Sequence, residues 1–305
     1  MPQHRLITRY LAATFLMLLV SGHSSATSLV TSIKPVELLV RAIATDNMQV
    51  QSLVPAGSSP HTYQLRPSDR RSLANAAAIF WIGPDMETFL TSIFASTELA
   101  ARSHTLEPDD GQEHSQAPTA SDADHAHDLE NGHNPHIWLD PEQARAMVRR
   151  IHQVLITLPG TDRQQLDRNL ANFEARLTAQ ETSLMQTLKP ARPLSLFTYH
   201  NAFKLYADYY GLTIRGVLSP SPDRTPGARQ LADIQQRLRA AVHPCVLVEP
   251  QFNRQHWAAI SEGLTLQRST WDPLATDVAA NRDGYLAFQQ SLADAVLACL
   301  PEQAQ

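Results

Sequence analysis

The sequence predicts an α/β protein with two lobes, each built on a mostly parallel sheet and joined to the other by one long helix. Strand-like and helix-like runs alternate in the N-terminal part of the chain, and the same alternation resumes in the C-terminal part. Between them lies a stretch without glycine or proline whose leucines recur at helical spacing. Alternating β and α segments are typical of parallel sheets covered by helices, so the two blocks indicate two lobes.

The first block is the predicted N-terminal lobe, residues 27–159. Its expected strands are short apolar or alternating runs, at Ser28–Ile33, Met48–Val54 and Ala78–Gly83. Its expected helices are Pro35–Ile43, Pro67–Ala76 and Glu142–Leu158. Proline lacks the N–H that the first turn of a helix leaves unpaired, so Pro35 and Pro141 mark helix starts.

Residues 160–189 are predicted to form the linking helix. The apolar positions recur every three or four residues, at Leu166, Leu170, Phe173, Leu177, Leu184 and Leu188. At about 1.5 Å per residue this helix is about 40 Å long, enough to span both lobes. We expect Thr161 to cap its N-terminus, because a threonine hydroxyl accepts a hydrogen bond from the first free N–H groups.

The predicted C-terminal lobe, residues 190–305, repeats the pattern of the first. Its expected strands are Pro193–Tyr199, Leu212–Leu218, Cys245–Pro250 and Leu264–Thr270. Its expected helices are Ala202–Tyr210, Ala228–Ala241, Arg254–Glu262 and a last one from Tyr285 to Leu300.

The N-terminus, residues 1–26, has the features of a cleavable secretory signal peptide. Arg5 and Arg9 precede an apolar run at Leu11–Val20 that is too short to span a bilayer, and small residues end at Ala26. We expect export from the cytoplasm, with an uncleaved membrane anchor as the alternative. No cysteine lies near the expected cleavage point, so lipid attachment there is excluded. The net charge of −5 and the lack of a basic cluster argue against nucleic-acid binding.

The only two cysteines, Cys245 and Cys299, form an even pair in a chain that we expect to be exported. A disulfide between them is the default in an oxidising compartment, and two free buried thiols are the alternative.

Residues 107–133 interrupt the alternation of strands and helices. Glu107–Glu130 contains eight acidic residues and no lysine or arginine. The histidines of this segment are His114, His125, His127 and His133. Such a polar segment buries too little apolar surface to fold, so we expect a mobile loop, either metal-gathering or a solvated acidic linker.

Three further histidines lie where the predicted strands end or where loop gives way to helix. His61 and His200 each follow a strand, and His136 lies just before the helix that Pro141 opens. Asp272 follows a fourth strand. Glu249 ends a strand, where it could support a metal ligand from behind, but a simple polar strand end is the preferred interpretation. Ligands bind in the crevice outside the carboxyl ends of parallel strands. Three imidazoles with a carboxylate suit zinc better than magnesium or calcium, which prefer oxygen ligands.

Several motifs together resemble a known family. "SSPHTYQLRPSD", "NPHIWLDP", "FTYHNAF", "PGARQL", "CVLVEPQF" and "WDPLATD" occur in this order over nearly the whole mature chain. They are similar to those of the ZnuA-type metal-binding components of bacterial ABC importers, the cluster A-I solute-binding proteins. The resemblance implies two α/β lobes bridged by a rigid helix, with a metal ion in the cleft between them.

The resemblance also implies a ligand set. His61, His136 and His200 match the three histidine ligands, and Asp272 matches the carboxylate that the manganese-binding branch uses as a fourth ligand. Zinc proteins of the family fill that place with water instead in some cases, so Asp272 or water is the fourth ligand. Some zinc members carry a glutamate directly before the first histidine, where this chain has Pro60. Histidine at position 200, where the manganese branch has a carboxylate, favours zinc.

The function implied is that of a monomeric periplasmic protein that binds zinc and delivers it to an ABC importer's permease, and so indirectly to its ATPase. The acidic loop with His114, His125, His127 and His133 is then a secondary, weaker zinc site. A manganese-binding importer component is one alternative. A secreted zinc hydrolase is another, but the H-E-x-x-H, G-x-S-x-G and P-loop motifs are missing from the sequence. A surface adhesin of the same fold usually carries a lipid anchor, which the sequence lacks.

Overall fold

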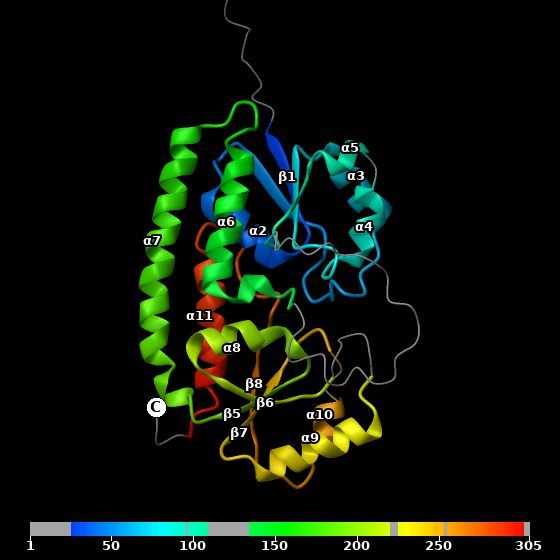
Figure 1. Cartoon of the computed structure of the whole chain (residues 1–305), viewed down its shortest axis with the longest axis vertical. Coiled ribbons are helices and arrows are strands. Elements are labelled where there is room, and N and C mark those ends of the chain that lie inside the picture. The colour runs from blue at the N-terminus through cyan, green and yellow to red at the C-terminus, as the bar shows by residue number, and fades with distance from the viewer. Residues whose placement is uncertain (1–25, 96, 109–133, 220–224, 253–254, 302–305) are drawn as a thin grey trace, which may run out of the picture.

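Two four-stranded parallel sheets organise the chain, one in each lobe (Figure 1). The computed structural model describes residues 26–301 except residues 96, 109–133, 220–224 and 253–254. The signal-peptide prediction for residues 1–26 thus falls almost wholly outside the described residues, as do the loop histidines His114, His125, His127 and His133.

The first sheet has the strand order β2-β1-β3-β4, and the second has the matching order β6-β5-β7-β8. The strands of the first sheet are β1 (Thr27–Thr31), β2 (Met48–Ser52), β3 (Ala78–Trp81) and β4 (Ser103–Thr105). Those of the second are β5 (Ser195–Thr198), β6 (Thr213–Val217), β7 (Pro244–Val248) and β8 (Gln267–Thr270). All pairs are parallel, so the carboxyl ends of each sheet's strands lie at one edge.

Helices cover both sheets, as the sequence predicted. Those before the long helix are α2 (Lys34–Ile43), α3 (Pro67–Asn75), α4 (Thr88–Phe94), α5 (Thr97–Ala100) and α6 (Pro141–Leu155), with the 3-10 turn η3 (Ile137–Leu139). Those after it are η4 (Lys189–Ala191), η5 (Asn201–Phe203), α8 (Lys204–Tyr210), α9 (Ala228–Ala240), α10 (Gln255–Ile260) and α11 (Gly284–Leu297). No helix in the described parts of the chain is long and apolar enough to cross a bilayer.

Besides the 3-10 turns η3 and η4, the structure adds β4, α4 and α5, which the sequence did not predict. The strand β4 has three half-buried residues at the edge of the sheet, and α5 has four residues. Elements this short fall below the length over which an apolar pattern can be recognised. Glu107, which we expected to begin the mobile loop, is buried, and its N–H donates to the carbonyl of Ile82 at 3.0 Å.

The long helix α7 (Arg163–Thr187) runs beside both lobes (Figure 1). The prediction of Thr161 as its N-cap is wrong, because the carboxylate of Asp162 accepts the hydrogen bond from the N–H of Gln165 at 2.9 Å. An aspartate at this position also interacts favourably with the positive end of the helix dipole.

α7 is fastened to both lobes by side chains on its buried face. The amide of Asn169 donates to the carbonyl of Ile43 at the end of α2, at 2.8 Å. Glu181 pairs with Arg145 of α6, and both carboxylate oxygens lie 2.8 Å from the same guanidinium nitrogen. Gln180 donates to the carbonyl of Leu286 in α11 at 2.7 Å.

α11 is a second connection between the lobes, since it packs against α2 and α7 as well as against β8. Its neighbour Arg282 donates to the carbonyl of Ala44 at 3.1 Å, and the hydroxyl of Tyr285 donates to the carbonyl of Trp138 at 2.8 Å. A single cluster of buried apolar side chains includes residues of both sheets, such as Leu29 and Leu247. The two lobes therefore share one core.

A disulfide joins Cys245 in β7 to Cys299 just after α11, at a sequence separation of 54 and with their Cα atoms 5.8 Å apart. Both residues are buried. The bond ties the end of the last helix to the centre of the second sheet.

Replacing both cysteines by serine should lower the stability of the protein by about 4 kcal/mol, because a closed loop of this length restricts the unfolded chain. Zinc affinity at room temperature should stay within about twofold, since the bond lies at the opposite end of β7 from the histidines. Thermal unfolding and zinc titration of the double variant measure the two effects. An unchanged melting temperature would contradict a stabilising role for the bond.

Candidate metal centre

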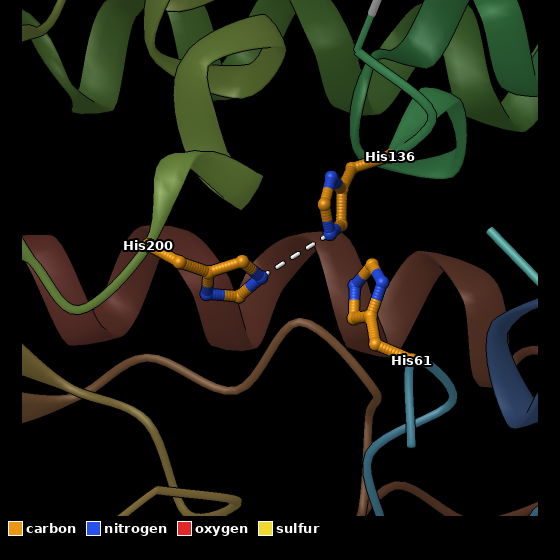
Figure 2. Close-up of side chains that lie close together, drawn as sticks. All are labelled: His61, His136 and His200. Atoms are coloured by element: carbon orange, nitrogen blue, oxygen red, sulfur yellow. Dashed lines mark hydrogen bonds between the residues drawn. The ribbon is translucent and has the colours of Figure 1, made fainter. Parts of the chain in front are cut away.

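Three histidines from separate parts of the chain converge between the lobes (Figure 2). His61, His136 and His200 each place one ring nitrogen so that the three atoms all lie within 4.8 Å of one another. The ring centroids are 5.0 Å apart for His136 and His200, and 5.5 Å for His61 and His136. Nε2 of His136 and Nε2 of His200 are separated by 3.2 Å. The structure thus brings together the three histidines that the sequence singled out.

The local sequence explains how each histidine reaches this point. His61 lies on the loop between β2 and α3, after the buried Pro60. His136 immediately precedes η3, and Asp140 caps α6 by accepting from the N–H of Glu142 at 2.7 Å. His200 lies two residues beyond β5, at the carboxyl edge of the second sheet.

Asn134 holds the ring of His136. Its side-chain oxygen lies 2.8 Å from Nδ1 of His136 and accepts from the backbone N–H of the same residue at 3.0 Å. Its amide nitrogen donates to the carbonyl of Asn201 at 2.8 Å, so the amide's oxygen faces the histidine. Since an amide oxygen only accepts, Nδ1 of His136 must carry the proton, which leaves the lone pair on Nε2.

Glu249 does the same for His200. One carboxylate oxygen lies 2.7 Å from Nδ1 of His200, and the other accepts from the backbone N–H groups of Tyr199 and His200 at 3.1 and 3.2 Å. Glu249 is buried. Of the two interpretations of Glu249, the structure favours support of a histidine over a simple polar strand end. Glu249 follows β7, and the pairing of β7 with β5, which the sequence pattern did not predict, brings it beside His200.

These contacts direct Nε2 of His136 and Nε2 of His200 toward each other, 3.2 Å apart (Figure 2). In the metal-binding form, in which each ring is neutral and carries its proton on Nδ1, both Nε2 atoms are acceptors and their lone pairs face each other. A cation between them removes the repulsion, and the ring of His61 supplies a third nitrogen (Figure 2). Three imidazole nitrogens match the ligand set of a zinc site.

The cavity at the histidines is small and mostly apolar. It is lined by Ser59, Pro60, His61, His136, Trp138, His200, Gln251, Phe252, Pro273 and Leu274. Burial in this environment lowers the pKa of His136 well below 6.5, and the neighbouring His200 and His61 lower it further. His136 is therefore neutral, and able to bind a metal, at pH 7.

Asp272 is not part of the histidine group. One of its oxygens accepts from the side-chain amide of Gln251 at 2.7 Å and from the N–H of Leu274 at 3.0 Å, and the other accepts from the N–H of Thr276 at 2.5 Å. The carboxylate thus organises the turn after β8. Asp272 is not among the residues that line the cavity, but Pro273, the next residue in the sequence, is.

Two lobes with parallel sheets and a group of ligands buried between them define the class of two-lobed solute-binding proteins. Residues 29–299 match the family described as "ZnuA: Zinc-uptake complex component A periplasmic". The chain therefore belongs to the ZnuA family.

Relatives and solved structures agree with this assignment. The chain is 30% identical to the high-affinity zinc uptake system protein ZnuA of Yersinia pestis, over 98% of this chain and 99% of that protein. It is 27% identical to the protein of the same name from Haemophilus ducreyi, over 89% of this chain and 93% of the relative. A crystal structure of ZnuA matches with a TM-score of 0.69 at 25% identity, covering 89% of this chain and 99% of that one. The periplasmic zinc-binding protein TroA of Treponema pallidum, at 19% identity and with a TM-score of 0.69, shares the fold, covering 88% of this chain and 99% of TroA.

Glu249→Gln should weaken zinc binding by about tenfold to a hundredfold, a common effect of removing the hydrogen-bond partner of a metal-binding histidine. The glutamine keeps the size of the side chain but not the charge that favours a proton on Nδ1 of His200. Competition with a chromophoric chelator measures the affinity. Glu174→Gln, on the outer part of α7 and paired with Arg149, is the control. Equal affinities in the parent and both variants would contradict the role of Glu249.

Zinc affinity should fall as the pH falls, because each imidazole must lose its proton to bind the metal. Since the pKa of His136 lies well below 6.5, protons compete at this residue only in more acidic solution, so the loss should steepen at the acidic end of the titration. Zinc titrations across the range from about pH 7.5 to 5 test this. A constant affinity would exclude a histidine site.

Proposed function

We propose that this protein captures Zn²⁺ in the periplasm as the binding component of an ABC zinc importer and delivers it to the permease. The observation that carries the proposal is the pair of facing Nε2 atoms of His136 and His200, 3.2 Å apart with both Nδ1 atoms held by acceptors. Membership of the zinc-uptake family supports it. The protein is a carrier and not an enzyme.

The ligand set favours zinc over manganese. The three atoms brought together are all imidazole nitrogens, which suit Zn²⁺, whereas Mn²⁺ prefers carboxylate and other oxygen ligands. The carboxylates near the site are already engaged, since Glu249 holds His200 and Asp272 holds the turn after β8. We propose His61, His136 and His200 as the protein ligands and a water molecule as the fourth.

The remaining features of the proposal concern the setting of the protein. Residues 1–26 direct export and are cleaved without lipid attachment. The mature protein acts as a monomer that meets the permease, and through it the ATPase, at the membrane surface. The acidic segment with His114, His125, His127 and His133 binds further zinc ions more weakly. The boundaries proposed for the lobes and the linking helix are those at residues 27, 160 and 190.

Changing His61, His136 or His200 singly to alanine should lower zinc affinity tenfold or more, because two nitrogens form a poor zinc site. Calorimetric titration of the mature protein measures the affinity and the number of tightly bound ions, expected to be one. His152→Ala is the matched control, since His152 lies on α6 and bonds to Asp167 of α7. Unchanged affinity in all three single variants would refute the site.

Deletion of residues 109–133 should leave the tight site intact and remove only weaker zinc equivalents, because the three proposed ligands lie outside the deleted segment. The deletion keeps Glu107, which is packed in the fold. Titration of the parent and the shortened protein compares the stoichiometries. Loss of tight binding on deletion would move the primary site into the removed segment.

A further inference from the structure

We infer that Gln251, oriented by Asp272, positions the fourth ligand of the metal and selects water for that place. The inference rests on the proposed function, since it concerns the same metal ion. Gln251 follows β7 two residues after Glu249 and lines the same cavity as the three histidines. The loop after β7 therefore contributes two residues to the site, Glu249 beside His200 and Gln251 in the lining of the cavity.

The contact with Asp272 determines which end of the Gln251 amide faces the cavity. The amide nitrogen donates to the Asp272 carboxylate at 2.7 Å. A carboxylate only accepts, so the oxygen end of the amide cannot take this place. Asp272 is itself held by the N–H groups of Leu274 and Thr276. Reversing the amide would therefore give up a hydrogen bond to a charged acceptor, among the stronger hydrogen bonds in proteins.

Two buried oxygens at this cavity lack partners. Within the described residues, Oε1 of Gln251 and Oγ of Ser59 are both shielded from solvent and have no hydrogen-bond partner, and both residues line the cavity. A buried acceptor without a partner is destabilising, so these atoms indicate a bound group that donates to them. The two residues come from different lobes.

The chemistry of these oxygens identifies the group that they bind. A water molecule on the metal carries two protons and can donate one to the amide oxygen of Gln251 and one to the hydroxyl of Ser59. An anion such as chloride or a carboxylate has no proton to donate, so its lone pairs would face the amide oxygen. Gln251 thus favours water over anions, and Asp272 acts on the metal through Gln251 and the water, without binding it directly.

The test uses Co²⁺ as a spectroscopic substitute for zinc in the mature protein, in water enriched in oxygen-17. Electron–nuclear double resonance should detect an oxygen-17 coupling from the bound water in the parent. Gln251→Glu should abolish it, because repulsion from Asp272 directs the new carboxylate onto the metal. Gln164→Glu, exposed in the first turn of α7, should keep it. No coupling in the parent, or a coupling that survives in Gln251→Glu, would overturn the inference.

A second variant covers failure of the first to fold. Gln251→Met keeps the length of the side chain but removes the acceptor, so the water should remain on the metal but be held less firmly. Azide should therefore displace the water at roughly threefold to tenfold lower concentration than in the parent, which corresponds to the loss of one hydrogen bond. Equal azide affinities, or no displacement from either protein, would overturn the role of Gln251. Zinc titration of the same samples distinguishes failure of this inference from failure of the proposed function, because a parent protein that does not bind zinc would refute the proposed function itself.

Discussion

The site depends on one constraint, which is that two imidazole nitrogens from different lobes face each other, 3.2 Å apart. The side-chain oxygen of Asn134 lies 2.8 Å from Nδ1 of His136, and a carboxylate oxygen of Glu249 lies 2.7 Å from Nδ1 of His200. Once both rings are neutral with their protons on Nδ1, two lone pairs face each other in an apolar cavity, which is unfavourable unless a cation lies between them. The groups behind the histidines therefore orient both rings for a metal ion. Burial lowers the pKa of His136, and the neighbouring imidazoles lower it further, so this ring is neutral at pH 7.

The frame around the site keeps the two lobes at a set separation. The indole N–H of Trp138 donates to the carbonyl of Pro273 at 2.7 Å, and the ammonium group of Lys34 donates to the carbonyl of Thr276 at 2.8 Å. These bonds cross from the first lobe to the turn that Asp272 organises. Separating the lobes would break them and expose the core that both sheets share. The fold therefore resists wide opening, and the histidines remain close together.

The two carboxylates near the histidines have different hydrogen-bond and ion-pair partners. Glu249 is fully engaged with His200 and two backbone N–H groups, and Asp272 is engaged with Gln251 and two others. Neither carboxylate belongs to the group of converging ligand atoms, and the residue directly before His61 is Pro60. The histidine group therefore carries no negative charge of its own, which suits an ion that is bound through nitrogen and later released.

Most of the fold was determined locally, because strand alternation, helical periodicity and proline at helix starts are properties of neighbouring residues. His61 and His200 were singled out because each follows a predicted strand, and His136 because it lies where the loop gives way to a helix, and the resemblance to the family grouped the three as ligands. The elements β4 and α5 are too short for an apolar pattern to be recognised. The choice of Asp162 over Thr161 as the cap of α7 depends on the local geometry of the turn. Only the tertiary structure decided which groups the carboxylates of Glu249 and Asp272 contact. A carboxylate's role depends on which donors lie within about 3 Å of its oxygens, and the pairing of β5 with β7 and the turn after β8 bring those donors together.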